Sequence, residues 1–367
     1  MNANVDLVGM NGQAQGVLAN NFLAQGQINP GMMKPFLDMR TGRAYVSIYK
    51  GGDPKDKKNY TVQMVANATL RRDEWKALDA AVMKESEYRL NGIADLISNN
   101  LTYNLGNAMG TTVLEWHDVS SELTAEVSMD GIARGKNNRP NFQHNYLPIP
   151  IIHAGYEINA RALAASRALG NPLDTTMAER AARAVNDKLE KMLFTNTSYS
   201  FGEVDSRSRN TIYSYLNYPD RNQVALTAPW TASGKTPAQI LADVVAMKQA
   251  SIDAYHYGPW VLYIPTAYET KLDEDYSTSG TSTQTIRERI LKISGIKDVK
   301  VVDVLPDDNL LLVQMTSDVV RLVRGMGLQN IQWKTEGNFT NNFKVLTIQV
   351  PQIRSDQNGK SGIVHMA

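Results

Sequence analysis

The C-terminal quarter of the chain constrains the fold most strongly. Residues 285–367 show a short helical pattern, two strands, a second short helix and a two-stranded ribbon that ends at the C-terminus. This long amphipathic tail is rich in strands and carries no residue pattern typical of catalysis. A tail of this kind has to be built into a sheet with other parts of the chain, so the sequence predicts an α+β fold.

Composition allows a large core and excludes several kinds of protein. A chain of 367 residues can form one large or two modest domains. Lys and Arg (38) nearly balance Asp and Glu (37), which argues against a polycation that wraps nucleic acid. With no cysteine there are no disulfides and no thiolate sites, as expected for a chain made in a reducing cytoplasm. No apolar run reaches about 18 residues, so we expect no membrane span.

The first part of the chain predicts extended segments around one long helix. Residues 1–30 are rich in Gln, Asn and Gly and predict an extended arm, and residues 34–51 predict a strand pair that turns at Thr41 and Gly42. A charged loop is expected over residues 51–60. One long helix is expected over residues 73–97, with Gly92 as its weak point. Residues 113–152 predict a protruding ribbon of two strands with a long polar tip.

Helices dominate the middle of the sequence. A short helix is expected over residues 159–169, and the strongest helical pattern follows over residues 176–194, opened by a capping box of Thr176 and Glu179. Its apolar stripe consists of Met177, Ala178, Ala181, Val185, Leu189 and Met192.

The remaining elements carry similar start and stop signals. Caps at Thr236, Thr266 and Thr285 predict three further helices, and the inward positions of the first are Ile240, Leu241, Val244, Val245 and Ile252. The apolar run over residues 260–265 predicts a buried strand. A flexible loop is expected over residues 277–284, and two more strands over residues 300–304 and 310–315.

The sequence contains no complete motif for phosphate binding, metal binding or nucleophilic catalysis. The segment ASGKT (residues 232–236) resembles a phosphate-binding loop, but Pro229 stands where that loop needs glycine, so a helix cap at Thr236 explains it better. The five histidines show no metal-binding spacing on a helix, and no Gly-x-Ser-x-Gly elbow is present. We therefore expect no catalytic residues, no bound cofactor and no metal.

The order of the elements resembles a known family. An arm, a long helix, a protruding ribbon, a long capped helix, a compact α/β section and a closing ribbon resemble the Hong Kong 97-type capsid fold, which tailed-phage major capsid proteins share with encapsulins. The resemblance lies in KPFLDMRTGRAYVSIY, in EWHDVSSELTAEVSMDG with YLPIPIIHAGYEINARAL, in LDTTMAERAARAVNDKLEKMLFTN, and in PWVLYIPTAYETKLDEDY with the segments after it.

The resemblance implies a division of the chain into the parts of that fold. Residues 1–60 would form the N-terminal arm and its anchoring strands, and residues 113–152 the E-loop. The peripheral (P) domain would take residues 61–112, 153–220 and 336–367, with the spine helix at residues 176–194. The axial (A) domain would take residues 221–335. The closing ribbon would turn in a hairpin at TEGNFTNN.

The resemblance also implies a function. The chain would be a structural major capsid protein, not an enzyme. It would assemble as pentamers and hexamers into the icosahedral shell of a tailed phage, in the host bacterial cytoplasm, around double-stranded DNA held by non-specific contacts. Portal, scaffolding and decoration proteins are its implied partners. Two alternatives remain: an encapsulin-type compartment that encloses cargo protein, and an α/β enzyme that uses residues 196–367 alone.

The ribbon tip carries the predicted contact between subunits. Arg134, Lys136 and Arg139 lie there without interleaved aromatic residues, so we expect them to meet carboxylates on a neighbouring subunit. Some relatives cross-link a Lys of the E-loop to an Asn of the peripheral domain. Lys136 and Asn338 occupy such positions, but one Lys and one Asn are easily matched by chance, and we do not expect cross-linking.

Overall fold

The three-dimensional structure is a computed structural model. It describes residues 35–38, 40, 44–49, 60–64, 70, 72–87, 91–106, 108–119, 129, 142–169, 175–201, 211–276, 284–334, 340–356 and 358–367. The predicted arm (residues 1–30), the turn at Thr41 and Gly42, nearly all of the loop over residues 277–284 and most of the expected hairpin at residues 335–342 lie outside these residues.

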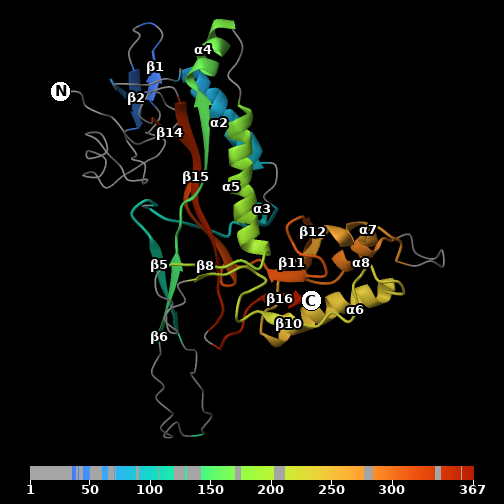
Figure 1. The fold of residues 1–367 in the computed structure, drawn as a ribbon. Coiled ribbons are helices and arrows are strands. Elements are labelled where there is room, and N and C mark those ends of the chain that lie inside the picture. Colours follow the sequence, from blue (N-terminus) through green and yellow to red (C-terminus); the bar gives the residue numbers. More distant parts are fainter. Residues whose placement is uncertain are drawn as a thin grey trace.

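A four-stranded sheet forms the long axis of the molecule (Figure 1). Its strands, in order, are β4 (Thr102–Asn104), β14 (Val320–Lys334), β15 (Thr340–Ile353) and β7 (Ile152–Asn159). The long strands β14 and β15 pair antiparallel along nearly their whole length. The second short helix expected in the C-terminal quarter is wrong, because Val320 onward continues as β14. Leu322, Val323 and Met326 stand at the spacing of a helical face, and the register shifts of β14 beside Met326 break the two-residue alternation of a strand.

The predicted long helix after the ribbon lies along this sheet. It is α5 (Thr176–Phe194), and it packs beside α2 (Arg72–Glu87) and against β7 and β15 (Figure 1). Ala178, Ala181, Val185, Leu189 and Met192 are buried as expected, whereas Met177 is 45% exposed. The predicted capping box is also wrong: the N-cap residue is Thr175, without a side-chain cap.

The structure describes two helices within the helix expected over residues 73–97. They are α2 and α3 (Asn91–Ser98), and residues 88–90 between them lie outside the described residues. Gly92 lies in the first turn of α3, where its backbone faces Phe194 at the end of α5. The position that the sequence marks as weak is therefore a point of close contact between α3 and α5.

A second sheet of five strands lies beside the lower end of α5 (Figure 1). Its order is β10 (Asn222–Val224), β16 (Ile363–Met366), β13 (Leu310–Gln314), β11 (Trp260–Pro265) and β12 (Ile296–Val302). Strand β11 is buried throughout, as predicted. Its residues alternate between two cores, with Val261 and Tyr263 in one and Leu262 and Ile264 in the other, which explains the unbroken apolar run.

Three helices cover one side of this second sheet (Figure 1). They are α6 (Pro237–Asp253), α7 (Glu269–Leu272), preceded by the 3-10 turn η3 (Thr266–Tyr268), and α8 (Ile286–Leu291). The caps at Thr236 and Thr285 are confirmed, and Thr236 forms a full capping box with Gln239. The cap at Thr266 is wrong, because Thr266 lies inside η3. In α6, Val245 is 48% exposed rather than inward.

Two strands pair across the predicted boundary between the axial domain (residues 221–335) and the last peripheral segment (residues 336–367). β14 lies in the range predicted for the axial domain and pairs with β15, which lies in the range predicted for the peripheral domain. β16 lies in the predicted peripheral range and pairs with β13 in the five-stranded sheet. The strand expected over residues 300–304 is β12 and begins earlier, because it pairs parallel with all of β11. Long-range strand pairing of this kind leaves no local signal in the sequence.

Smaller elements complete the fold. β1 (Pro35–Leu37), β2 (Ala44–Tyr49) and β3 (Tyr60–Met64) form a three-stranded sheet, which adds a strand to the predicted pair. α4 (Ala160–Leu169) is confirmed, and β8 (Tyr199–Ser200) pairs with β9 (Thr211–Ile212). No described helix combines the length and the apolar character that crossing a membrane requires.

Candidate functional site

The predicted contact residues Arg134, Lys136 and Arg139 lie outside the described residues, as do Asn338 and the rest of the ribbon tip except Met129. The structure does describe the strands that lead to the tip. β5 (Val113–Val119) and β6 (Phe142–Pro148) pair antiparallel, and they lie at the opposite end of the molecule from β1 and β2 (Figure 1). The predicted ribbon is therefore confirmed at its base, and the role of its tip stays a prediction.

The base of the ribbon has an inner and an outer face. Leu114, Trp116 and Leu147 belong to the inner face and pack on the core formed by β14 and β15. On the outer face, Glu115, His117 and His144 are exposed. This separation follows from the two-residue period of a strand, which sends alternate side chains to opposite faces.

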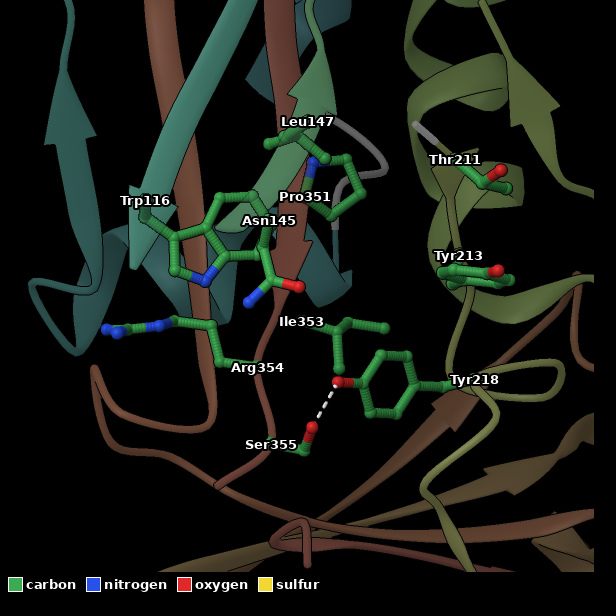
Figure 2. A pocket seen from close by; sticks show the side chains of 10 residues that line it. All are labelled: Trp116, Asn145, Leu147, Thr211, Tyr213, Tyr218, Pro351, Ile353, Arg354 and Ser355. Carbon is green, nitrogen blue, oxygen red and sulfur yellow. Dashed lines mark hydrogen bonds between the residues drawn. The ribbon is translucent and has the colours of Figure 1, made fainter. Parts of the chain in front are cut away.

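A small cavity lies where the ribbon meets the body of the protein (Figure 2). Its volume is about 30 Å³, which suits a water molecule and not an organic ligand. Figure 2 shows Trp116 and Asn145 of the ribbon on one side and Tyr213 and Tyr218 on the other. The Tyr218 hydroxyl donates to Ser355 Oγ at 2.8 Å and so joins its wall of the cavity to the segment that follows β15. The cavity therefore lies at the contact between the ribbon and the body of the protein.

A larger cavity of about 480 Å³ lies between β7 and α5. Its lining is mainly apolar, and Ile151 and Tyr199 are 45% and 44% exposed. The ionisable side chains in the lining are His153, Lys188 and Tyr199. Partial burial and the charge of Lys344 lower the pKa of His153, so its imidazole is neutral at pH 7. This cavity can receive apolar groups, and the described residues of its lining include no carboxylate.

Buried ionisable groups link α3 and α5 to the five-stranded sheet. Asp95 pairs with Lys300 of β12 and accepts a hydrogen bond of 2.8 Å from the Tyr263 hydroxyl. Glu190 of α5 accepts a hydrogen bond of 2.9 Å from the backbone N–H of Gly92. Burial raises the pKa of Glu190 to about 7. Neither cavity described above is lined by these groups, so they serve as a polar link between helices and sheet.

The sequence search missed the grouping of Glu115, His117 and His144. Within the part of the chain that the structure describes, they are the one set of three acidic, histidine or cysteine side chains placed to share an ion. The pair Glu115 and His117 could have been noticed, because residues two apart on a strand share a face. The approach of His144 depends on the register of a strand pair with a long tip, which the local sequence does not reveal.

Comparison with known proteins adds a family and a fold. The sequence profile of a family described as a family of unknown function (DUF6260) matches residues 64–366. Among curated protein sequences, none matches the chain.

Several solved structures share the fold of this chain at low sequence identity. A virus-like particle from Pyrococcus furiosus has a TM-score of 0.56 and 16% identity, with 80% of this chain and 99% of that chain covered. The capsid of Myoviridae phage XM1 has a TM-score of 0.55 and 10% identity, with 76% and 91% covered. The capsid of a native GTA particle has a TM-score of 0.54 and 12% identity, also with 76% and 91% covered. These similarities confirm the Hong Kong 97-type capsid fold.

Proposed function

The chain belongs to this family of unknown function, and from its fold we propose that it is a structural subunit that assembles with copies of itself into a closed protein shell. One observation carries the proposal. The fold extends over about three quarters of the chain and nearly all of each similar protein, and the proteins concerned are capsids and a virus-like particle.

The surfaces of the subunit support assembly. A two-stranded ribbon is marginally stable alone in water. Among the described residues, β5 and β6 are anchored to the body on their inner face, while Glu115, His117 and His144 on the outer face are exposed. The larger cavity between β7 and α5 adds a mainly apolar concave surface. A neighbouring subunit would cover such features, and a shell repeats the contact many times, so a modest contact free energy suffices for each subunit.

The finer proposal is the shell of a tailed phage, built from pentamers and hexamers around double-stranded DNA in the host cytoplasm. The similarity to the capsid of phage XM1 supports it. In this proposal residues 1–60 form the arm, residues 113–152 the E-loop, and the remaining residues the peripheral and axial domains with the bounds predicted above. The pairing of β14 with β15 and of β16 with β13 then joins these two domains. The near-neutral charge of the chain fits DNA held by confinement with weak, salt-sensitive contacts.

A compartment that encloses cargo protein is the second candidate. It is supported by the similarity to the virus-like particle from Pyrococcus furiosus, a particle that is not described as a phage capsid. The two candidates differ in their contents and in their gene neighbourhood. Terminase and portal genes beside this gene would indicate a phage, whereas a peroxidase or ferritin-like gene would indicate a compartment.

Light scattering on the full chain tests the proposal. After size-exclusion chromatography, a shell subunit should give particles in the megadalton range. An α/β enzyme should give a small oligomer of defined mass instead, and that result would contradict the shell. Particles purified from the native source should then contain nuclease-protected DNA in the phage case and a co-purifying protein in the compartment case.

A further inference from the structure

We propose that Glu115, His117 and His144 form a binding site for a divalent transition-metal ion of the Zn²⁺ class on the outer face of the ribbon. The inference does not depend on the proposed shell. It departs from the expectation of no metal, which considered helical spacing and could not use the pairing of β5 with β6.

The strand register brings the three side chains together. His117 lies directly opposite His144 in the antiparallel pair, with ring centroids 4.4 Å apart and ring planes at 89°. Glu115 precedes His117 by two residues and so shares its face. Glu115 Oε1 lies 3.0 Å from His144 Nδ1. The ligand atoms of all three residues lie within 4.8 Å of one another.

These distances suit a tetrahedral ion. Zn²⁺ binds imidazole nitrogen and carboxylate oxygen at about 2.0–2.2 Å, which places neighbouring ligand atoms roughly 3.3 Å apart. The ligand atoms of Glu115 and His144 are 3.0 Å apart, close to this spacing, and small side-chain rotations would bring His117 to it. Three protein ligands leave a fourth position for water. Two imidazoles favour a transition metal over Ca²⁺ or Mg²⁺, which prefer oxygen ligands.

The site is accessible and joins two strands. All three side chains are exposed, so an ion can enter without a change of fold. On the inner face, Trp116 and Leu147 hold the same strands against the body. An ion bound to both β5 and β6 would therefore fasten the ribbon from its free side. The alternative is a plain exposed ion pair between Glu115 and His144, which contributes little to stability.

A competition titration tests the site. The untagged full chain is titrated with Zn²⁺ against a chromogenic chelator, and we expect one ion per chain. His117→Gln and His144→Gln should each weaken the affinity at least about tenfold, since loss of even an outer partner of a metal ligand costs that much. Glu115→Gln should weaken it too. His153→Gln and Glu157→Gln, which change exposed residues of β7, should bind as the wild type does, and excess Ca²⁺ should not compete.

Hydrogen exchange locates the effect. In the wild type, Zn²⁺ should slow amide exchange within residues 113–119 and 142–148, and His144→Gln should abolish that protection. The proposal is overturned if the wild type binds no Zn²⁺, or if the ribbon variants bind it as tightly as the two β7 variants. Binding that leaves exchange in both strands unchanged would also contradict an ion held between them.

Discussion

At the scale of single residues, Glu190 has the clearest thermodynamic consequence. Its carboxyl group is buried in α5 beside Gly92 and near Asp95, and burial raises its pKa from 4.5 to about 7. A carboxyl group with a raised pKa in the folded state stabilises the fold fully below the unfolded pKa, and this contribution is lost as the pH rises through the folded pKa. The free energy of unfolding should therefore fall between about pH 4.5 and 7, by about 3 kcal/mol from this group.

The variant Glu190→Gln tests this pH dependence. Glutamine cannot ionise, so the difference in unfolding free energy between wild type and variant should shift in favour of the variant from pH 5 to pH 8. Denaturant melts at both pH values measure it. Glu269→Gln, an exposed change on α7, serves as the control and should leave the pH dependence unaltered. A constant difference for Glu190→Gln would mean that its carboxyl titrates as an ordinary exposed one.

At Gly92, close packing against Phe194 outweighs the preference of a helix for alanine over glycine. Alanine is ordinarily better than glycine within a helix by about 1 kcal/mol. A Cβ at Gly92, however, would lie 2.4 Å from Phe194 Cε2. Overpacking of this kind costs about 1–3 kcal/mol, so Gly92→Ala should lower the melting temperature. At Gly155 of β7 the nearest atom to an added Cβ is 3.7 Å away, and Gly155→Ala should melt close to the wild type. Equal melting of the two variants would show that Phe194 yields easily.

At the scale of elements, α5 organises the four-stranded sheet. Val185 is 1% exposed and packs in the core shared by α2, α5 and β15. An unpaired Asp buried there should cost several kcal/mol, which is comparable to the stability of a whole domain. We therefore expect Val185→Asp to be insoluble or unfolded in an expression and melting assay. Met177→Asp, on the exposed side of the same helix, should fold normally; soluble, cooperatively melting Val185→Asp would contradict this packing.

Elements with a distinct local pattern were predictable, and those defined by distant partners were not. β11 was predicted because both of its faces are covered, and α5 because its small and apolar residues repeat at helical spacing. β14 was missed in part, since two register shifts in its pairing with β15 break the two-residue alternation that would reveal it. The place of β16 between β10 and β13 depends on contacts across the whole chain.

The candidate sites follow the same rule. The ribbon itself was predicted from two strand-like segments, and its base is confirmed. The meeting of Glu115 and His144, and of Asp95 with Lys300, results from pairing between residues far apart in sequence. Single polar residues on apolar helix faces, such as Asp95 and Glu190, were the available signal for the buried group.

At the scale of the whole molecule, the ribbon tip should separate assembly from folding. Changing Arg134, Lys136 and Arg139 to Glu replaces any attraction to a neighbour's carboxylates by repulsion, and it leaves every described core residue in place. Exposed ion pairs are worth about 0.2–1 kcal/mol each, but a shell repeats them at every subunit. The triple variant should keep a wild-type circular dichroism spectrum and remain as free subunits or capsomers in light scattering.

Salt and a matched variant make this test specific. High salt should partly restore assembly of the triple variant, because it screens the repulsion. Changing the exposed residues Lys76, Lys292 and Lys297 to Glu alters the net charge equally and should affect assembly less. Normal particles at every salt concentration would show that the tip makes no electrostatic contact between subunits. A triple variant that cannot fold would place the tip in the core of the subunit.

Imaging of the expressed full chain is the most direct test of whether it assembles into a closed protein shell. Negative-stain electron microscopy of the untagged protein, purified without any partner protein and examined at near-physiological salt, reports whether it forms shells. A shell subunit should form closed, hollow particles of uniform size, built from many copies of this one chain. A homogeneous population of small oligomers or monomers, from a protein that circular dichroism shows to be folded, would contradict it.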